Sequence, residues 1–341
     1  MRLGVLAWAL SCWAAVALAA DEYAFLGPAP ARNFAPIQLI FLNLPFERAA
    51  TLRAGGIGLR VDSAEANVIA TTQGPTESVL KFETNRTVVG ARYGIAEHWE
   101  VGLDLPFISR FGGFLDPFID EIEYIFNAGN PERDYFHNNT FGGFSVVRGT
   151  TALFSGHKET LELGDLWVSV KRSVATGDTT PRVALRAAVK APTGDADEVV
   201  GSGKPDFGFG VLAEHRLLRR MMLYLDLSIV YPVGPITPAR LTLDPILSES
   251  FAAEFALTSG VSAVLHQAVY TSPMHGTGTA LLNNGVAELG LGLNWACTPS
   301  LGLQLLAIDN VSGVESASDF TVLLAAKWIV NRESSLVDRD S

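Results

Sequence analysis

The sequence predicts an all-β protein, an antiparallel transmembrane β-barrel with a long and partly helical outer loop. The 341 residues are 48% hydrophobic, include 32 glycines and are only 18% charged. Beyond residue 20, however, no apolar run reaches the roughly 20 residues that a membrane-spanning helix needs. Apolar residues instead alternate with polar residues or glycines over stretches of about ten residues, which is typical of barrel strands. Lipid accepts only helices and closed barrels, because these structures satisfy every backbone group.

The composition excludes several other classes of protein. A disordered chain would combine low hydropathy with high charge, whereas the mean hydropathy here is +0.24. A nucleic-acid-binding domain would be basic, but this chain has a net charge of −11, so no nucleic acid is expected as a partner. The two cysteines, Cys12 and Cys297, are too few for a small disulfide-stabilised scaffold.

The first 20 residues predict a secretory signal peptide. Met1-Arg2 precedes the uncharged apolar run from Leu3 to Ala20, which ends in the small-residue motif Ala17-Leu18-Ala19. We expect cleavage near Ala19 or Ala20, which removes Cys12 and sends the mature chain to the outer membrane of a Gram-negative bacterium.

The alternation divides the chain into strands. Trp99, Val101 and Leu103, for example, alternate with Glu100 and Gly102, so one face is apolar and the other polar or small. A soluble β-sandwich also alternates, but the signal peptide, the strand length and the aromatic residues near strand ends favour a barrel. Twelve strands are predicted, an even number that suits a single-chain bacterial barrel: 51–61, 79–94, 98–109, 162–174, 182–191, 206–217, 220–231, 250–259, 261–272, 285–297, 301–310 and 319–330.

The connections between these strands predict the orientation of the barrel, residues 51–330. Short and long connections alternate, and barrels place short turns in the periplasm and long loops outside. Both ends of the barrel domain are therefore predicted to be periplasmic. This count treats the apolar stretch 141–154 as loop structure. A fourteen-strand alternative would add a strand at 36–46.

The longest connection, residues 110–161, is predicted to be a large extracellular loop containing an amphipathic helix. Its apolar residues recur at helical spacing: Phe118, Ile119, Ile122, Ile125 and Phe126. Acidic residues gather in this loop and in the loop near residue 195. They either keep the loops soluble or hold Ca²⁺ or Mg²⁺ that bridges lipopolysaccharide phosphates: Asp116, Asp120, Glu121, Glu123, Asp195, Asp197 and Glu198.

The predicted lumen is where solute contacts would be made. Residues 21–50, rich in proline, are expected to form a plug or a periplasmic collar. A barrel of twelve strands lies between the filled interior of eight and the open channel of sixteen, so an open channel and a plugged pore both remain possible. The alternation predicts ten polar lumen-lining residues: Glu100, Asp104, Lys171, Arg186, Lys190, Asp226, Glu288, Asn294, Gln304 and Lys327.

Several motifs resemble an outer-membrane barrel family of proteobacteria that has no known function and is about 340 residues long. They are Gly27-Pro28-Ala29-Pro30-Ala31-Arg32-Asn33, Pro36-Ile37-Gln38-Leu39, Arg92-Tyr93-Gly94, Leu105-Pro106-Phe107, Gly112-Gly113-Phe114-Leu115-Asp116 and Ser316-Ala317-Ser318-Asp319-Phe320. The resemblance covers nearly the whole mature chain and implies the fold and the location, but no catalytic residue. Gly164-Asp165 with Lys171, and Pro192-Thr193-Gly194-Asp195, are similar to the barrels named for phenol meta-pathway degradation and assumed to be transporters.

The end of the chain departs from many outer-membrane barrels, which finish on an aromatic residue used in assembly. Here Trp328-Ile329-Val330 is followed by the polar tail 331–341. The expected partners are outer-membrane lipid and lipopolysaccharide, the barrel-assembly machinery during biogenesis and a small solute.

No cofactor motif and no metal-ligand spacing occurs in the sequence. The most plausible function is passive passage of small solutes, as in a porin, without enzymatic activity. One alternative is an enzyme acting on lipid or lipopolysaccharide through His98, His137 or His266. A second is a closed structural barrel that binds a partner through residues 110–161.

Overall fold

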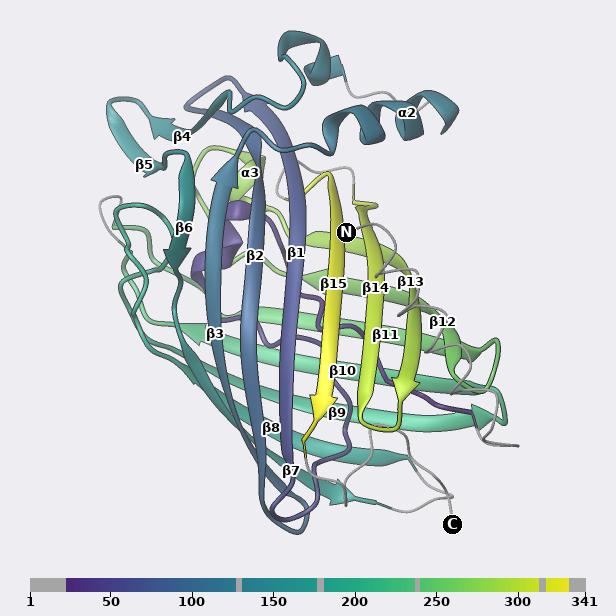
Figure 1. The fold of residues 1–341 in the computed structure, drawn as a ribbon. Coiled ribbons are helices and arrows are strands. Elements are labelled where there is room, and N and C mark those ends of the chain that lie inside the picture. Colours follow the sequence, from purple (N-terminus) through teal and green to yellow (C-terminus); the bar gives the residue numbers. More distant parts are fainter. Residues whose placement is uncertain (1–22, 127–130, 177–180, 237–239, 313–316, 331–341) are drawn as a thin grey trace.

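A closed ring of twelve antiparallel strands forms the body of the protein (Figure 1). The computed structural model describes residues 23–126, 131–176, 181–236, 240–312 and 317–330, so the predicted signal peptide and polar tail lie outside the described residues. The ring strands, in spatial order, are β1 (Ile57–Thr72), β2 (Thr76–Ala96), β3 (Trp99–Phe111), β7 (Trp167–Ala175), β8 (Arg182–Lys190), β9 (Asp206–Leu218), β10 (Met221–Pro232), β11 (Ile246–Ala256), β12 (Val261–Tyr270), β13 (Val286–Thr298), β14 (Leu301–Asn310) and β15 (Phe320–Ile329).

The ring closes where β15 pairs with β1, with Ile329 opposite Gly58 and Phe320 opposite Asn67. The predicted fold class and strand count are therefore confirmed. The fourteen-strand alternative is wrong, because residues Pro36–Ile40 form a 3-10 helix (η1) instead of a strand.

The first ring strand is Ile57–Thr72, so the predicted strand at 51–61 is present but its bounds are wrong, since only residues 57–61 overlap β1. The predicted long connection at 62–78 is only the three residues between β1 and β2. The cause lies on the outward face of β1. Asn67 and Thr71 on this face bond to residues of the 110–161 connection instead of facing apolar surroundings, so the strand carries no apolar-polar alternation here.

Three short strands extend the wall at one end of the ring. β4 (Gly143–Arg148) pairs with the start of β2 and with β5 (Thr151–Ser155), while β6 (Glu159–Leu163) pairs with β3. Residues 141–154, predicted as loop, therefore contain most of a β-hairpin, which adds no strand to the ring. Pairing with the long strand β2 satisfies the backbone hydrogen-bonding groups of β4.

The predicted amphipathic helix in the same connection is confirmed as α2 (Asp116–Phe126). It is followed by the 3-10 helix η2 (Pro131–Tyr135) and crosses one end of the ring (Figure 1). Ile119 is buried, and the Phe118 ring lies 5.8 Å from that of Phe320. A further helix, α3 (Ala280–Asn283), is short. Within the described residues, no helix has both the length and the apolarity to cross a bilayer.

The two faces of the wall differ in chemistry. Along β9, buried and exposed side chains alternate from Asp206 to Glu214. Large apolar side chains on the outward face are exposed, among them Leu185, Val189, Phe207, Phe209, Leu227, Leu247, Leu265, Leu291, Leu305 and Leu324. An apolar surface of this extent is unfavourable in water and matches the apolar outer band of a transmembrane barrel.

Candidate functional site

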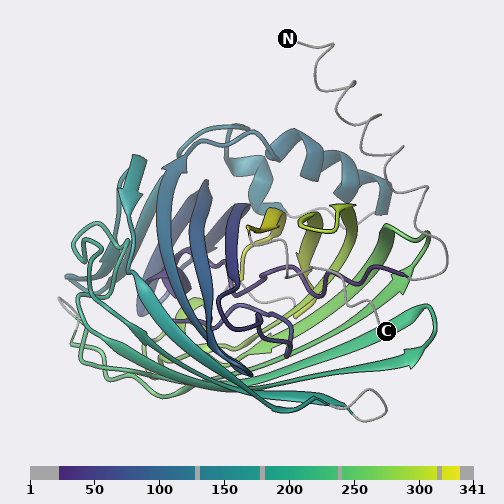
Figure 2. The ribbon, with the colours of Figure 1, turned by 60° about the horizontal axis from the view of Figure 1, so that its bottom comes forward.

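The lumen contains the chain's own N-terminal region. Residues 23–49, here called the internal segment, run inside the ring of strands (Figure 2), and most of them are buried. η1 and the residues after it supply apolar side chains to the interior, and Ile37, Ile40 and Phe41 pack in one cluster with Phe82 and Trp167. The interior of the barrel is thus a packed core over much of its length.

Carboxylates of the wall accept hydrogen bonds from the backbone of the internal segment. Glu254 accepts from the N–H groups of Leu26 and Gly27 at 3.1 and 3.0 Å. Asp206 accepts from Leu42 N–H at 2.7 Å, and Glu214 accepts from Ala49 N–H at 3.1 Å. An extended segment cannot satisfy its own backbone groups, so the wall provides the acceptors it needs.

Basic and amide side chains of the wall donate to the carbonyl groups of the same segment. They include six of the ten predicted lumen-lining residues. Lys171 donates to Arg48 O, Arg186 to Pro45 O, Lys190 to Ile40 O, Asn294 and Gln304 to Gly27 O, and Lys327 to Pro28 O, at distances from 2.5 to 3.2 Å. These side chains therefore hold the segment in place.

The other four predicted residues are acidic, and their contacts differ. Asp104 is fully buried and pairs with Arg60 and Arg92, each at 2.7 Å. Asp226 pairs with Arg186 at 2.7 Å, and Glu100 accepts from Leu52 N–H at 2.9 Å and pairs with Lys171.

Glu288 is buried, and neither of its carboxylate oxygens has a hydrogen-bond partner among the described residues. All ten side chains lie on the inward face of the wall. A role in solute passage stays a prediction.

Three of the most connected side chains are missing from the predicted set: Glu254, Asp206 and Glu214. The alternation contains the signal for them. Glu254 lies between the outward-facing Ala253 and Phe255, and Asp206 and Glu214 lie at the two ends of the alternating run in β9. Their partners in the internal segment carry no such signal, because apolar and polar residues do not alternate regularly in that segment.

Two cavities lie within the described interior. One of about 140 Å³ is near the end that carries β4 and β5 and is lined by Ile40, Leu153, Val199 and Ser202, among others. The second, here called the basal cavity, is about 190 Å³ in volume. It lies at the opposite end of the ring, where β1 begins and β15 ends, and the internal segment contributes to the lining of both cavities.

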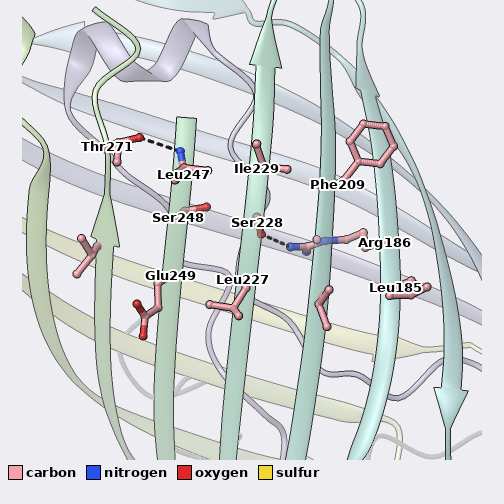
Figure 3. Close-up of a pocket in the computed structure, with 13 residues that line it drawn as sticks. Leu185, Arg186, Phe209, Leu227, Ser228, Ile229, Leu247, Ser248, Glu249 and Thr271 are labelled. Atoms are coloured by element: carbon pink, nitrogen blue, oxygen red, sulfur yellow. Dashed lines mark hydrogen bonds between the residues drawn. The ribbon is translucent and has the colours of Figure 1, made fainter. Parts of the chain in front are cut away.

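A larger hollow of about 640 Å³ lies on the outer surface of the wall, across β8 to β12. Figure 3 shows its residues, with outward-facing Leu227 and Leu247 beside Glu249, while Arg186 reaches toward Ser228. Because its exposed side chains are mostly apolar, this hollow belongs to the outer apolar surface, and the lumen is the better candidate site.

The acidic residues of the 110–161 connection are partly engaged in ion pairs. Asp116 pairs with Lys81 at 2.5 Å and with Arg133 at 3.1 Å, and it accepts from Asn67. Burial raises the pKa of Asp116, but the hydrogen bonds from Lys81, Asn139 and Asn67 outweigh it and hold the pKa below its usual value. No group of three or more metal-ligating side chains is found among the described residues.

Of the three histidines proposed for the enzymatic alternative, His98 and His137 are exposed and His266 is buried. His98 is exposed in the turn after β2, and His266 is buried with its ring 5.5 Å from that of Phe46. Among the described residues, no hydrogen bond joins a histidine to a serine, although His157 contacts Glu198 and His275 contacts Asp244. The histidine-serine contact that a hydrolase triad uses is absent from this part of the chain.

Comparison with known proteins agrees with this architecture. The sequence model of a family described as "Protein of unknown function (DUF3187)" matches residues 5–328. No curated protein matches the sequence. The COG4313 outer membrane channel from Pseudomonas putida F1 is similar in structure, with a TM-score of 0.58 and 12% identity over 84% of this chain and 99% of that one. The fold is thus a β-barrel like that of a bacterial outer-membrane channel.

Two further solved structures are more distant. The NanC porin matches with a TM-score of 0.44 and 9% identity, over 79% of this chain and 98% of that one. The CymD monoaromatic hydrocarbon channel matches with a TM-score of 0.39 and 10% identity, over 92% of this chain and 96% of that one.

Proposed function

The chain belongs to the DUF3187 family of proteins of unknown function, and we propose that it is a passive channel for small solutes in a bacterial outer membrane, plugged by its internal segment. The proposal includes the predicted signal peptide, periplasmic ends, the 110–161 connection on the outer side, contact with lipopolysaccharide and insertion by the barrel-assembly machinery. The proposed role is non-enzymatic.

One observation carries the proposal. The inward polar side chains bind mainly to the backbone of the internal segment, through Glu254, Asp206, Lys190 and Arg186. These contacts would be lost if the segment moved, leaving a lumen lined with both signs of charge. Such a lumen suits small polar or ionic solutes. The two cavities at opposite ends of the ring support the same view, since each provides space for a small solute beside the internal segment.

The similar COG4313 structure is that of an outer membrane channel. This likeness supports a channel role for the present chain, although the chemistry of the solute does not follow from a shared fold.

Single-channel recording in planar bilayers tests the proposal. We expect the purified protein to conduct above background, and we expect a larger conductance for Glu254→Ala, because this change frees the start of the internal segment. Glu249→Ala is the matched control, since Glu249 lies on the same strand but is on the outward face. If folded wild-type protein and Glu254→Ala both fail to conduct, the channel proposal is wrong and a closed barrel is favoured.

A further inference from the structure

The lining of the basal cavity contains more cationic than acidic side chains, together with apolar side chains. Five cationic side chains line it, namely Arg48, Arg60, Arg92, Lys171 and Lys327, against the two carboxylates of Glu47 and Glu100. Its apolar lining comes from Leu26, Pro30, Phe46, Leu52 and Ile329.

Four of the five cations already have carboxylate partners. Arg48 pairs with Glu214 at 2.9 Å, and Arg92 pairs with Asp104 at 2.7 Å. Arg60 pairs with both Asp62 and Asp104, each at 2.7 Å.

Lys171 lies between the two carboxylates of the cavity, 3.4 Å from Glu47 and 3.2 Å from Glu100. Glu47 also pairs with Arg186 at 2.9 Å, so both acidic groups of the cavity are engaged by cations other than Lys327.

Lys327 differs from the other four. Its ammonium donates to Pro28 O at 3.2 Å, and it makes no ion pair with any described residue. An ammonium has three donors, so this contact uses one of them. Lys327 is also directly opposite Arg60 in the pairing of β1 with β15. Like charges in directly opposite positions of a sheet destabilise it. Arg60 is balanced by Asp62 and Asp104, whereas Lys327 has no carboxylate partner among the described residues, so an anion at Lys327 would balance its charge.

We propose that the basal cavity binds a small monocarboxylate with a short apolar tail, its carboxylate at Lys327 and Arg60 and its tail against Leu26, Phe46 and Ile329. The volume of about 190 Å³ is below the range of about 300–1,000 Å³ for drug-sized ligands, so the ligand is small. The apolar lining distinguishes such a ligand from an inorganic anion. As a statement about the solute, this inference rests on the proposed channel function.

The experiment is calorimetric titration of the full-length protein in detergent with three probes. Hexanoate carries both the charge and the tail, acetate keeps the charge alone, and 1-hexanol keeps the tail alone. We expect hexanoate to bind at least about tenfold more tightly than either of the others, because a charge-assisted hydrogen bond and buried methylene groups both contribute. Equal binding of hexanoate and hexanol, or no binding of hexanoate at millimolar concentration, overturns the proposal.

Variants identify the residue responsible. Lys327→Met should weaken hexanoate binding by about tenfold or more, whereas Lys327→Arg, which keeps the charge, should retain most of it. Lys158→Met is the control, because Lys158 is exposed near the opposite end of the ring. Heat-modifiable migration on gels verifies folding. Unchanged binding in folded Lys327→Met overturns the assignment. If Lys327→Met does not fold, loss of hexanoate binding in folded Lys327→Arg overturns it instead.

The outcomes separate this inference from the channel function. Conductance without hexanoate binding rejects the anion site and leaves the channel, whereas hexanoate binding without conductance leaves the site and rejects the channel.

Discussion

The backbone N–H of Gly27 donates to Glu254 Oε2 at 3.0 Å, which joins the internal segment to β11 across 227 residues of sequence. The same carboxylate accepts from Leu26 N–H, from the hydroxyls of Tyr224 and Ser262, and from the Asn294 amide. Five uncharged donors thus converge on one buried carboxylate. Glu254 therefore anchors the start of the internal segment to the wall.

Replacing Glu254 by alanine should destabilise the barrel and release the start of the segment. The change leaves five donors without their acceptor, and each buried unsatisfied donor costs about 1–3 kcal/mol. We expect the free energy of unfolding, from urea titration in lipid vesicles, to fall by about 3 kcal/mol or more. Glu249→Ala on the outward face should cause no loss, and an equal loss in the two variants would contradict the anchoring role.

Gly27→Ala tests the conformation of the segment at the same point. Gly27 has a φ of +82°, and a Cβ there would overlap the side chain of Arg48. Gly55 has a φ of +77° with open space around it, so Gly55→Ala meets the backbone strain alone, about 1–2 kcal/mol. The unfolding free energy should fall further for Gly27→Ala than for Gly55→Ala. Equal losses would mean that the contact with Arg48 does not matter.

The sequence predicts the wall well because lipid and lumen impose opposite chemistry on alternate residues. β9 shows this, since Phe207, Phe209 and Val211 are exposed and the residues between them are buried. Eleven of the twelve ring strands can be found by this rule. β1 cannot be placed in the same way, because Asn67 and Thr71 on its outward face bond to the 110–161 connection and carry no apolar signal.

The candidate site is predicted less completely. The inward positions of Arg186 and Lys190 follow from alternation, but their contacts with Pro45 and Ile40 do not. Those contacts depend on the path of the irregular internal segment. Apolar and polar residues do not alternate regularly in that segment, so its sequence does not indicate which groups face the wall. Glu254, in contrast, lies on the inward face of β11, and the same alternation that predicts Asp226 also predicts its inward position.

Arg186 and Asp226 should be strongly coupled in stability. Arg186 donates to Asp226 at 2.7 Å and to Glu47 at 2.9 Å in the buried lumen. Arg186→Met leaves Asp226 without its cation and leaves Glu47 with Lys171 alone, a loss of about 3–5 kcal/mol, whereas Arg186→Met with Asp226→Asn also removes the unpaired charge of Asp226. In a double-mutant cycle, the double variant should therefore lose less than the sum of the single variants. Strict additivity would show that the pair does not interact.

Asp116 should make the attachment of α2 to the wall dependent on pH. Its pKa is held below the usual value by Lys81, Asn139 and Asn67 despite burial. A carboxyl whose pKa is lower in the folded than in the unfolded state stabilises the fold above its unfolded pKa of about 3.9, and this stabilisation is lost as the pH falls through the folded pKa. Hydrogen exchange of residues 116–126 should therefore be constant at neutral pH and become faster, after correction for intrinsic rates, below pH about 4.

Asp116→Asn provides the comparison for this last prediction, since it removes the charge at every pH. It should exchange faster than wild type at neutral pH and show a much weaker pH dependence. Asp120→Asn is the matched control on the same helix, because the Asp120 side chain is 39% exposed and its nearest approach to Arg133 is 3.9 Å. Exposed pairs at such distances contribute little, so this variant should follow wild type. If wild type and Asp116→Asn respond alike to acid, the ion pair with Lys81 does not hold α2 against the wall.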